Sequence, residues 1–208
     1  AFIPNAHNIF EKNPERGFVS SANQYPVDNT YPYYITATHY EAYRNRRINN
    51  VLRSAENITY RDMMRLQTDN YNLKAAESLP LFLSYLDTTQ LDPLQKQAYR
   101  ILRSWDYINS ANSAGATYYE AWWDNLMPLL WDEMENARHA LSRPTTFNTI
   151  RLLKELPNLS FFDIGQTPEK EAAGDVIRKA FILGVRDIEV WKTRNPTLPV
   201  WGEYKDSF

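Results

Sequence analysis

Asn23 is the residue of this sequence best suited to chemistry. It follows a run of small residues in NPERGFVSSANQYP (residues 13–26). A turn at the start of this stretch leads into apolar residues that predict a short strand over about 17–22, and Ser-Ser-Ala then stands where a sheet would favour Val or Ile. Asn23 itself has two interpretations. It is a turn residue, or it is an exposed amide held at a strand end, where its NH2 group can donate to a developing oxyanion. Spacing alone does not decide between them.

Arg44 is the second candidate, because it lies on the helix predicted to follow this stretch. An arginine on a helix surface is usually solvated, but it can also belong to a site. Its sequence position is compatible with both.

The rest of the sequence carries no established catalytic pattern. The motifs HExxH, GxxxxGK[ST], GxGxxG and GxSxG are absent. The three histidines lack the spacing of metal ligands, and a packing or surface role is favoured for each; they are His7, His39 and His139.

Other polar and aromatic candidates are better explained structurally. Asp28 follows a turn and can cap it or bind a cation, and capping is favoured. The acidic group Asp132, Glu133 and Glu135 is typical of a solvated helix face. Trp122-Trp123 stands in the middle of a predicted helix, where core packing is favoured over a ligand site.

The elements that must position these residues are mainly helices. From about residue 37 the apolar residues recur at helical spacing, and cap residues with N1 prolines mark several helix starts. We expect helices over 38–55, after the N-cap Thr59, around 79–86 with Pro80 at the start or at a kink, from Asp92-Pro93 to 105, over 114–131, after Pro144, and from Thr167-Pro168 to Trp191. The tail from Arg194 to Phe208 is expected to be extended and irregular.

Composition narrows the class of protein. The chain has 208 residues, a formal net charge of −2 and no cysteine, which argues against nucleic acid or an anionic membrane as partner and rules out disulfides. No stretch approaches the roughly 20 apolar residues of a membrane span. The start at Ala1 lacks a signal peptide and an initiator Met, so we expect a mature or excised piece. A lone strand beside helices also predicts that its partner strands lie outside this chain.

Several stretches, in order along most of the chain, together resemble the penicillin acylase (penicillin amidase) family. They are NPERGFVSSANQYPVDNTYPYY, HYEAYRNRRINNVL with its Arg-x-x-x-Ile pattern, ITYRDMMRLQTDNYNLKAAESLPLFLSYL, ILRSWDYINSANSAGATYYEAWWDNL, SFFDI and VWGEY. Each is weak alone, and their common order makes chance agreement improbable.

The resemblance implies an N-terminal-nucleophile hydrolase. In that family an N-terminal Ser, freed by self-cleavage, attacks an amide carbonyl with its own α-amine as base. A backbone N–H and an Asn side chain then hold the oxyanion. On this match the Asn is Asn23, and the arginine that helps orient it is Arg44.

The sequence departs from the family in two respects. The nucleophile is missing, since Ala1 has no hydroxyl, and so are the flanking strands of the αββα core and the carboxylates that often bind calcium. Where the family often has two adjacent Asn residues, this chain has Asn23-Gln24, which leaves the contact made by the second residue open.

We therefore expect a mainly α protein, in which residues 1–36 form an irregular segment with one strand of the hydrolase core and residues 37–208 form a helical domain. The parent enzyme would hydrolyse N-acyl amides, such as an N-acyl β-lactam nucleus or an N-acyl homoserine lactone. Its partners would be the rest of the acylase and the small-molecule substrate, with no cofactor held by this chain and a periplasmic or secreted location. The alternative is a helical interaction module that binds a protein partner through an aromatic-rich surface, since the chain has 14 Tyr, 6 Trp and 9 Phe.

Overall fold

The computed structural model describes residues 2–35, 41–135, 137 and 141–206. By their contacts they form two compact units, Ala1–Asp69 and Asn70–Phe208. The expected division of the chain into residues 1–36 and residues 37–208 stays a prediction. Two of the candidate histidines, His39 and His139, lie outside the described residues.

The first unit is a long irregular segment followed by two helices. It contains the 3-10 turn η1 (Asn5–His7), α1 (Tyr43–Ser54) and α2 (Tyr60–Gln67). The predicted strand over 17–22 does not form, because no other segment of this unit pairs with it; the bridge Tyr71–Ile108 is the only strand-like pairing among the described residues. The helix predicted from residue 38 begins at Tyr43, and residues 36–40 are not described.

The start of α2 is as predicted. The backbone N–H of Thr59 donates to the Asp62 carboxylate over 2.9 Å, and the Asp62 N–H donates back to the Thr59 hydroxyl. The hydrogen bonds from the Thr59 hydroxyl and N–H lower the pKa of Asp62 below its usual value. The cap therefore fixes the start of α2 at Tyr60.

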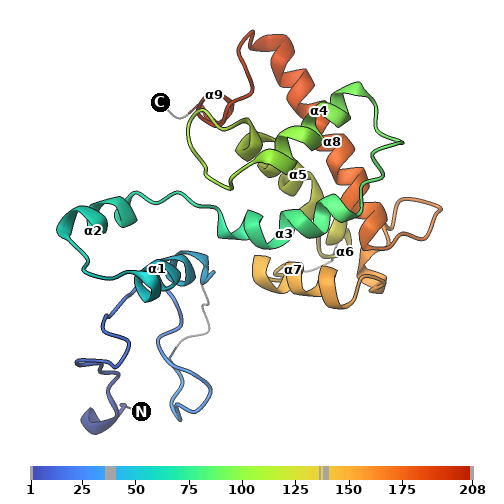
Figure 1. Cartoon of the computed structure of the whole chain (residues 1–208). Coiled ribbons are helices and arrows are strands. Elements are labelled where there is room, and N and C mark those ends of the chain that lie inside the picture. The colour runs from blue at the N-terminus through green and yellow to red at the C-terminus, as the bar shows by residue number, and fades with distance from the viewer. Residues whose placement is uncertain (1, 36–40, 136, 138–140, 207–208) are drawn as a thin grey trace. The chain divides into compact units, whose positions relative to one another are not determined.

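Helices joined by loops, together with the single bridge Tyr71–Ile108, form the described part of the second unit (Figure 1). Its elements are α3 (Leu73–Ser84), α4 (Pro93–Ser104), α5 (Ala114–Leu130), α6 (Asp132–Glu135), α7 (Thr146–Glu155), η2 (Ser160–Phe162), α8 (Ala173–Arg194) and α9 (Trp201–Lys205). The predicted helices that correspond to α4, α5 and α7 are confirmed, and the Asp92 cap with N1 Pro93 is present. Pro80 lies inside α3.

Two predictions about the last third of the chain are wrong. Helix α8 begins at Ala173, not after Thr167, because Thr167 instead uses its hydroxyl to bond the Glu171 carboxylate over 2.7 Å and the Ile164 carbonyl over 2.8 Å. The true start is marked by the Ala172 N–H, which donates to Asp175. The tail is also not irregular throughout, since it folds into α9.

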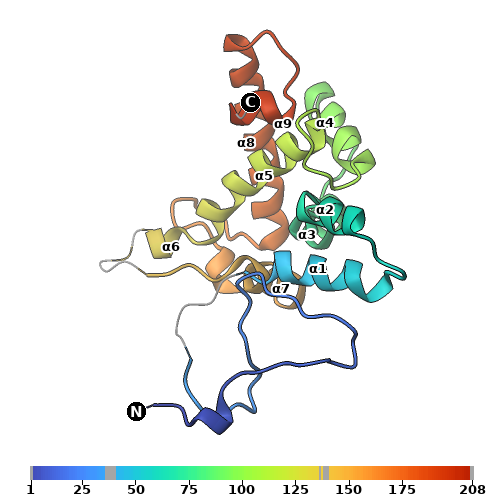
Figure 2. The ribbon, with the colours of Figure 1, turned by 90° about the vertical axis from the view of Figure 1, so that its left-hand side faces the viewer.

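The core of the second unit lies where α5 crosses α8 (Figure 2). Gly184 makes this approach possible, because a Cβ there would stand 2.9 Å from the backbone of Ala121 and Trp122. Trp122 is 1% exposed and its indole N–H donates to the Ile177 carbonyl over 2.8 Å. The prediction that the Trp122-Trp123 pair packs in the core is thus confirmed.

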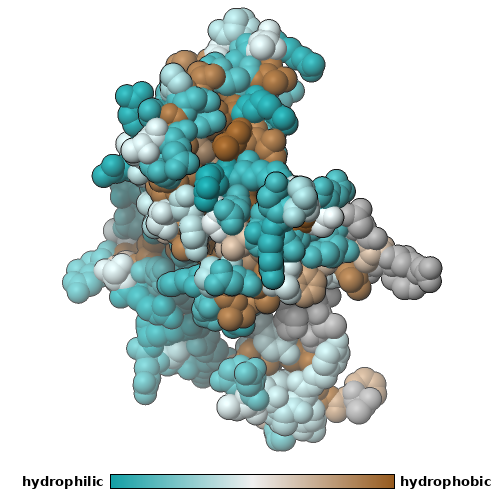
Figure 3. Space-filling model, turned by 90° about the vertical axis from the view of Figure 1, so that its right-hand side faces the viewer, coloured by the Kyte–Doolittle hydropathy of each residue, from teal (hydrophilic) through white to brown (hydrophobic). Residues whose placement is uncertain are grey.

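The surface mixes hydrophilic and hydrophobic residues. Figure 3 shows a face on which hydrophilic residues predominate and hydrophobic ones occur in scattered patches. Among the helices that the structure describes, none has the length and apolar character needed to cross a lipid bilayer.

The two units differ in how much apolar surface they bury. In the first unit the only buried residues among those described are Asn49 and Leu52, whereas the second buries more than two dozen hydrophobic side chains. Burial of apolar surface is the main stabilising contribution to folding. The first unit therefore depends mainly on polar contacts for its structure.

We expect native-state amide exchange to separate the two units. Amides in the middle of α5 and α8 should exchange only through global unfolding, and those of residues 13–25 through local opening, at least a hundredfold faster. Mass-spectrometric exchange on the dilute chain measures this. Equal protection of residues 13–25 and α5 would contradict the account.

Candidate functional site

The structure brings the two predicted site residues together. Arg44, in the first turn of α1, donates from Nη2 to Oδ1 of Asn23 over 2.5 Å. A guanidinium has no acceptor, so only the oxygen of the Asn23 amide can face it. The bond therefore fixes which way this amide points and leaves its NH2 group as the outward donor.

The Asn23 NH2 group has no hydrogen-bond partner in the described part of the chain. Asn23 and Arg44 are both exposed, so their bond is screened by water and contributes on the order of tenths of a kcal/mol to about 1 kcal/mol to stability. Its main effect is to orient the amide.

The backbone at Asn23 is in the left-handed region, with φ at 62°. Asn adopts this conformation more readily than most residues, which agrees with its interpretation as a turn residue. The turn and donor interpretations are compatible here, because the turn projects the side chain that Arg44 then holds.

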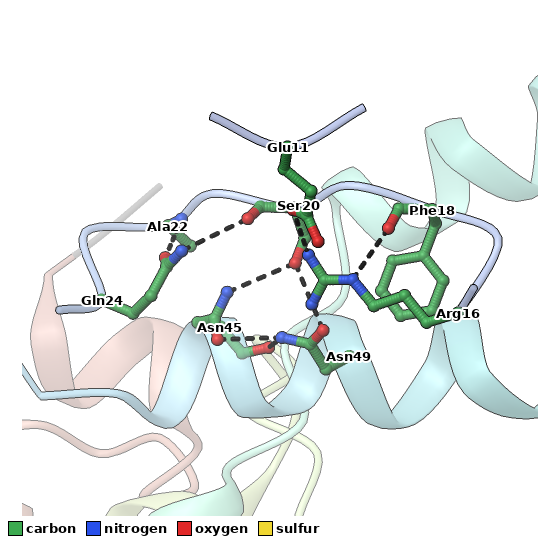
Figure 4. Close-up of polar contacts among 8 residues, drawn as sticks. All are labelled: Glu11, Arg16, Phe18, Ser20, Ala22, Gln24, Asn45 and Asn49. Carbon is green, nitrogen blue, oxygen red and sulfur yellow. Dashed lines mark hydrogen bonds and ion pairs between the residues drawn. The ribbon is translucent and has the colours of Figure 1, made fainter. Parts of the chain in front are cut away.

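Gln24 closes the loop over residues 20–24 by bonding the backbone of Ser20 and Ala22 (Figure 4). The Gln24 side chain donates from Nε2 to the Ser20 carbonyl over 3.2 Å and accepts from the Ala22 N–H over 2.7 Å. The sequence left open which contact the residue after Asn23 makes. In the structure this residue, Gln24, bonds the backbone of its own loop.

Two amides of α1 hold the other end of the loop. Asn45 donates to the Ser20 hydroxyl over 3.5 Å, and that hydroxyl donates to Oδ1 of Asn49 over 3.3 Å (Figure 4). Asn49 in turn donates to Oδ1 of Asn45 over 2.8 Å. The sequence assigns no role to Ser20, Asn45 or Asn49, although two Asn residues four apart on α1 are a signal that they share one helix face.

A pocket of about 420 Å³ lies beside these side chains. Polar groups make up much of its lining, and its apolar residues come from two places in the irregular segment, residues 9–10 and 25–26. The lining residues are Ile9, Phe10, Glu11, Arg16, Ser20, Gln24, Tyr25, Pro26, Asn45 and Asn49. Arg16 is held by Glu11 over 2.6 Å and by the Phe18 carbonyl over 2.9 Å. Asn23 does not line this pocket, so the pocket is not the place toward which the Asn23 NH2 group donates.

The remaining sequence candidates have structural contacts. Asp28 accepts hydrogen bonds from the N–H and hydroxyl of Thr30, which lower its pKa, and this supports the capping interpretation. The ring of His7 bonds the Tyr33 hydroxyl over 2.7 Å. Asp132 accepts from the Gly165 N–H over 3.0 Å.

Metal binding has no ligand set in the part of the chain that is described. No group of three or more His, Asp or Glu side chains there stands close enough to hold an ion. The structure therefore assigns none of the described residues to the calcium that the resemblance associates with the parent enzyme.

Comparison with known proteins gives one clear result. The family model described as penicillin amidase matches residues 1–207, which is nearly the whole chain. None of the curated proteins matches it. The family assignment therefore rests on the agreement of the whole chain with the family model.

Proposed function

Since this chain belongs to the penicillin amidase family, we propose that it is the part of an amide hydrolase that carries the oxyanion-binding Asn23 and the supporting Arg44. The substrate is an N-acyl amide. The nucleophile is an N-terminal Ser of the enzyme that matches no residue of this chain. The rest of the acylase is therefore the chain's partner.

The reaction defines what Asn23 must do. The Ser oxygen adds to the amide carbon and its proton passes to the enzyme's α-amine, so that negative charge develops on the former carbonyl oxygen. The C–N bond then breaks as the amine leaves with a proton, and water hydrolyses the acyl-enzyme by the same steps. Donors already aimed at the oxyanion lower both barriers, because they need no reorganisation when the charge forms.

The observation that supports this role most is the bond from Arg44 to the Asn23 oxygen. It occupies the acceptor end of the amide and leaves the NH2 end free, which is the orientation an oxyanion requires. The positive guanidinium also stands next to the amide and favours negative charge nearby.

The substrate class and the cellular location of the enzyme are proposed from family membership and not from the contacts of Asn23 and Arg44. A β-lactam nucleus or a homoserine lactone bearing an N-acyl group belongs to the proposed substrate class. We propose a periplasmic or secreted enzyme on the basis of family membership.

We expect the 208-residue chain by itself to show no hydrolysis of chromogenic N-acyl amides, because a donor without nucleophile and base retains only a small residual rate. The processed enzyme that contains it should hydrolyse at least one of them. Initial rates over a panel of acyl groups test both statements. Saturable hydrolysis by the rigorously purified chain would contradict the proposed division of labour, and a processed enzyme inactive on every amide would refute the function.

A further inference from the structure

We propose that Gln24 is a positioning residue for Asn23, acting together with a hydrogen-bonded ring formed by Ser20, Asn45 and Asn49. The inference rests on the proposed function, because that function assigns the oxyanion-binding role to Asn23. It adds that the donor is aimed from two sides: Arg44 holds the amide, and Gln24 with the ring holds the loop that carries it.

The ring ties the loop to α1. Each of its three side chains donates one hydrogen bond and accepts one within it, from Asn45 to Ser20, from Ser20 to Asn49 and from Asn49 back to Asn45. The two bonds at the Ser20 hydroxyl are long, at 3.5 and 3.3 Å, and the Asn49–Asn45 bond within α1 has an ordinary length of 2.8 Å. Asn49 is only 7% exposed, so its amide is costly to leave unpaired. Its NH2 group donates to the backbone carbonyl and the side-chain oxygen of Asn45, and the Ser20 hydroxyl supplies the donor for its oxygen.

Gln24 connects Ser20, which the ring holds, to the residue that precedes Asn23. Its side chain accepts from the Ala22 N–H and donates to the Ser20 carbonyl, and so bridges two residues that precede Asn23 in the chain. Side chains supply the hydrogen bonds that hold the loop, because residues 18–24 make no backbone–backbone hydrogen bond in the described part of the chain. Besides Gln24 and the ring, Arg16 donates to the Phe18 carbonyl and Arg44 donates to Asn23. Apolar packing is no substitute either, since Leu52 is the one buried hydrophobic residue among those described in this unit.

The chemistry of the bridge demands glutamine. Asparagine is one methylene shorter and cannot reach both partners. Glutamate can accept from the Ala22 N–H but cannot donate to the Ser20 carbonyl. A displacement of an oriented group by about 1 Å can cost up to 10²-fold in rate, so loss of the bridge should be visible in turnover.

The test is a double-mutant cycle between Gln24 and Asn23 in the processed enzyme. We expect Gln24→Ala to lower kcat about tenfold and to change KM less than about twofold, with a smaller loss for Gln24→Glu. In an Asn23→Ala background, Gln24→Ala should lower kcat by less than about twofold, because the group that it positions is gone. Gln67→Ala, an exposed glutamine on α2 of the same unit, should leave kcat unchanged.

The outcomes separate the two proposals. Equal losses from Gln24→Ala in both backgrounds would show that Gln24 acts independently of Asn23, which overturns this inference and leaves the oxyanion role intact. Near-normal turnover of Asn23→Ala alone would overturn both. If Gln24→Ala does not fold or process, Ser20→Ala serves instead: it breaks the ring at the loop but leaves the Asn49–Asn45 bond within α1. An undiminished kcat in that variant would count against the ring.

Discussion

Replacing Asn23 by Ala in the processed enzyme is expected to lower kcat by about 10²–10³-fold, the usual cost of removing one oxyanion donor. KM should change less than kcat, because the hydrogen bond strengthens only as charge develops on the oxygen. Steady-state kinetics on the folded and correctly processed variant measures both values.

Two further substitutions separate the donor role from the turn role. Asn23→Gly keeps the left-handed backbone at no steric cost, so a mere turn residue could be replaced in this way with near-normal turnover. The donor role predicts that Gly is as harmful as Ala. Asn23→Asp should be at least as harmful, because a carboxylate accepts from Arg44 but repels the oxyanion.

A matched control lies close by. Asn29 is exposed, lies in a turn of the same segment and makes no hydrogen bond through its side chain in the described part of the chain, so Asn29→Ala should leave kcat unchanged. Retention of more than about a third of the wild-type kcat by both Asn23→Ala and Asn23→Gly would be incompatible with the oxyanion role.

Arg44→Ala should also lower kcat, although less than the loss of Asn23 itself. It frees the amide to rotate but leaves the donor present. This gradation is expected if Arg44 orients Asn23, and the reverse order would point to a direct role of the guanidinium.

Trp122→Ala should lower the free energy of unfolding of the second unit by about 3–5 kcal/mol, the range for removal of a large buried aromatic side chain. The ring of Trp122 lies 4.8 Å from that of Phe181 on α8 and 5.3 Å from that of Phe82 on α3, measured between centroids. The close backbone approach at Gly184 limits how far α5 and α8 can collapse into the space that is left.

Denaturant unfolding monitored by circular dichroism measures this loss. Trp201→Ala is the control, because Trp201 is only half-buried on the short α9 and should cost much less. Trp122→Phe keeps an aromatic ring but loses the bond to the Ile177 carbonyl, so its cost should lie between the two. A loss below about 1 kcal/mol for Trp122→Ala would show that the α5–α8 contact does not carry the core.

The parts of this fold that sequence predicts well are those set by local chemistry. Thr59 and Asp92 cap α2 and α4 as expected, because a cap involves residues only three apart. The long α5 is also predictable, since Ala, aromatic and other apolar residues occupy most of its positions.

The errors occur where other contacts override the expected cap or chain pattern. Thr167 has the sequence of a cap but bonds Glu171, and α9 forms in a stretch whose prolines suggest an irregular tail. The backbone N–H groups of Trp201 and Gly202 bond carbonyls near residues 111–113, a contact that no local pattern reveals.

The candidate site likewise has features that the sequence predicts and features that it does not. Asn23 and Arg44 were found through a resemblance, and their hydrogen bond joins residues 21 positions apart that spacing could not connect. Gln24 was noticed only as a departure from the family pattern. Its bridge depends on the backbone bend at residues 20–24, which becomes visible only in three dimensions.

The central claim, that the Asn23 amide binds the oxyanion of the transition state, is tested most directly by inhibitor affinity. Kd can be measured by calorimetry for the wild-type processed enzyme and for Asn23→Gly, with two ligands that share one acyl group. The first is a boronic acid that forms a tetrahedral oxyanion adduct, and the second is an ether analogue without a carbonyl oxygen. We predict that Asn23→Gly weakens binding of the boronic acid about 10²-fold or more and that of the ether less than about threefold. Equal changes for both ligands, or an unaltered affinity for the boronic acid, would contradict the account.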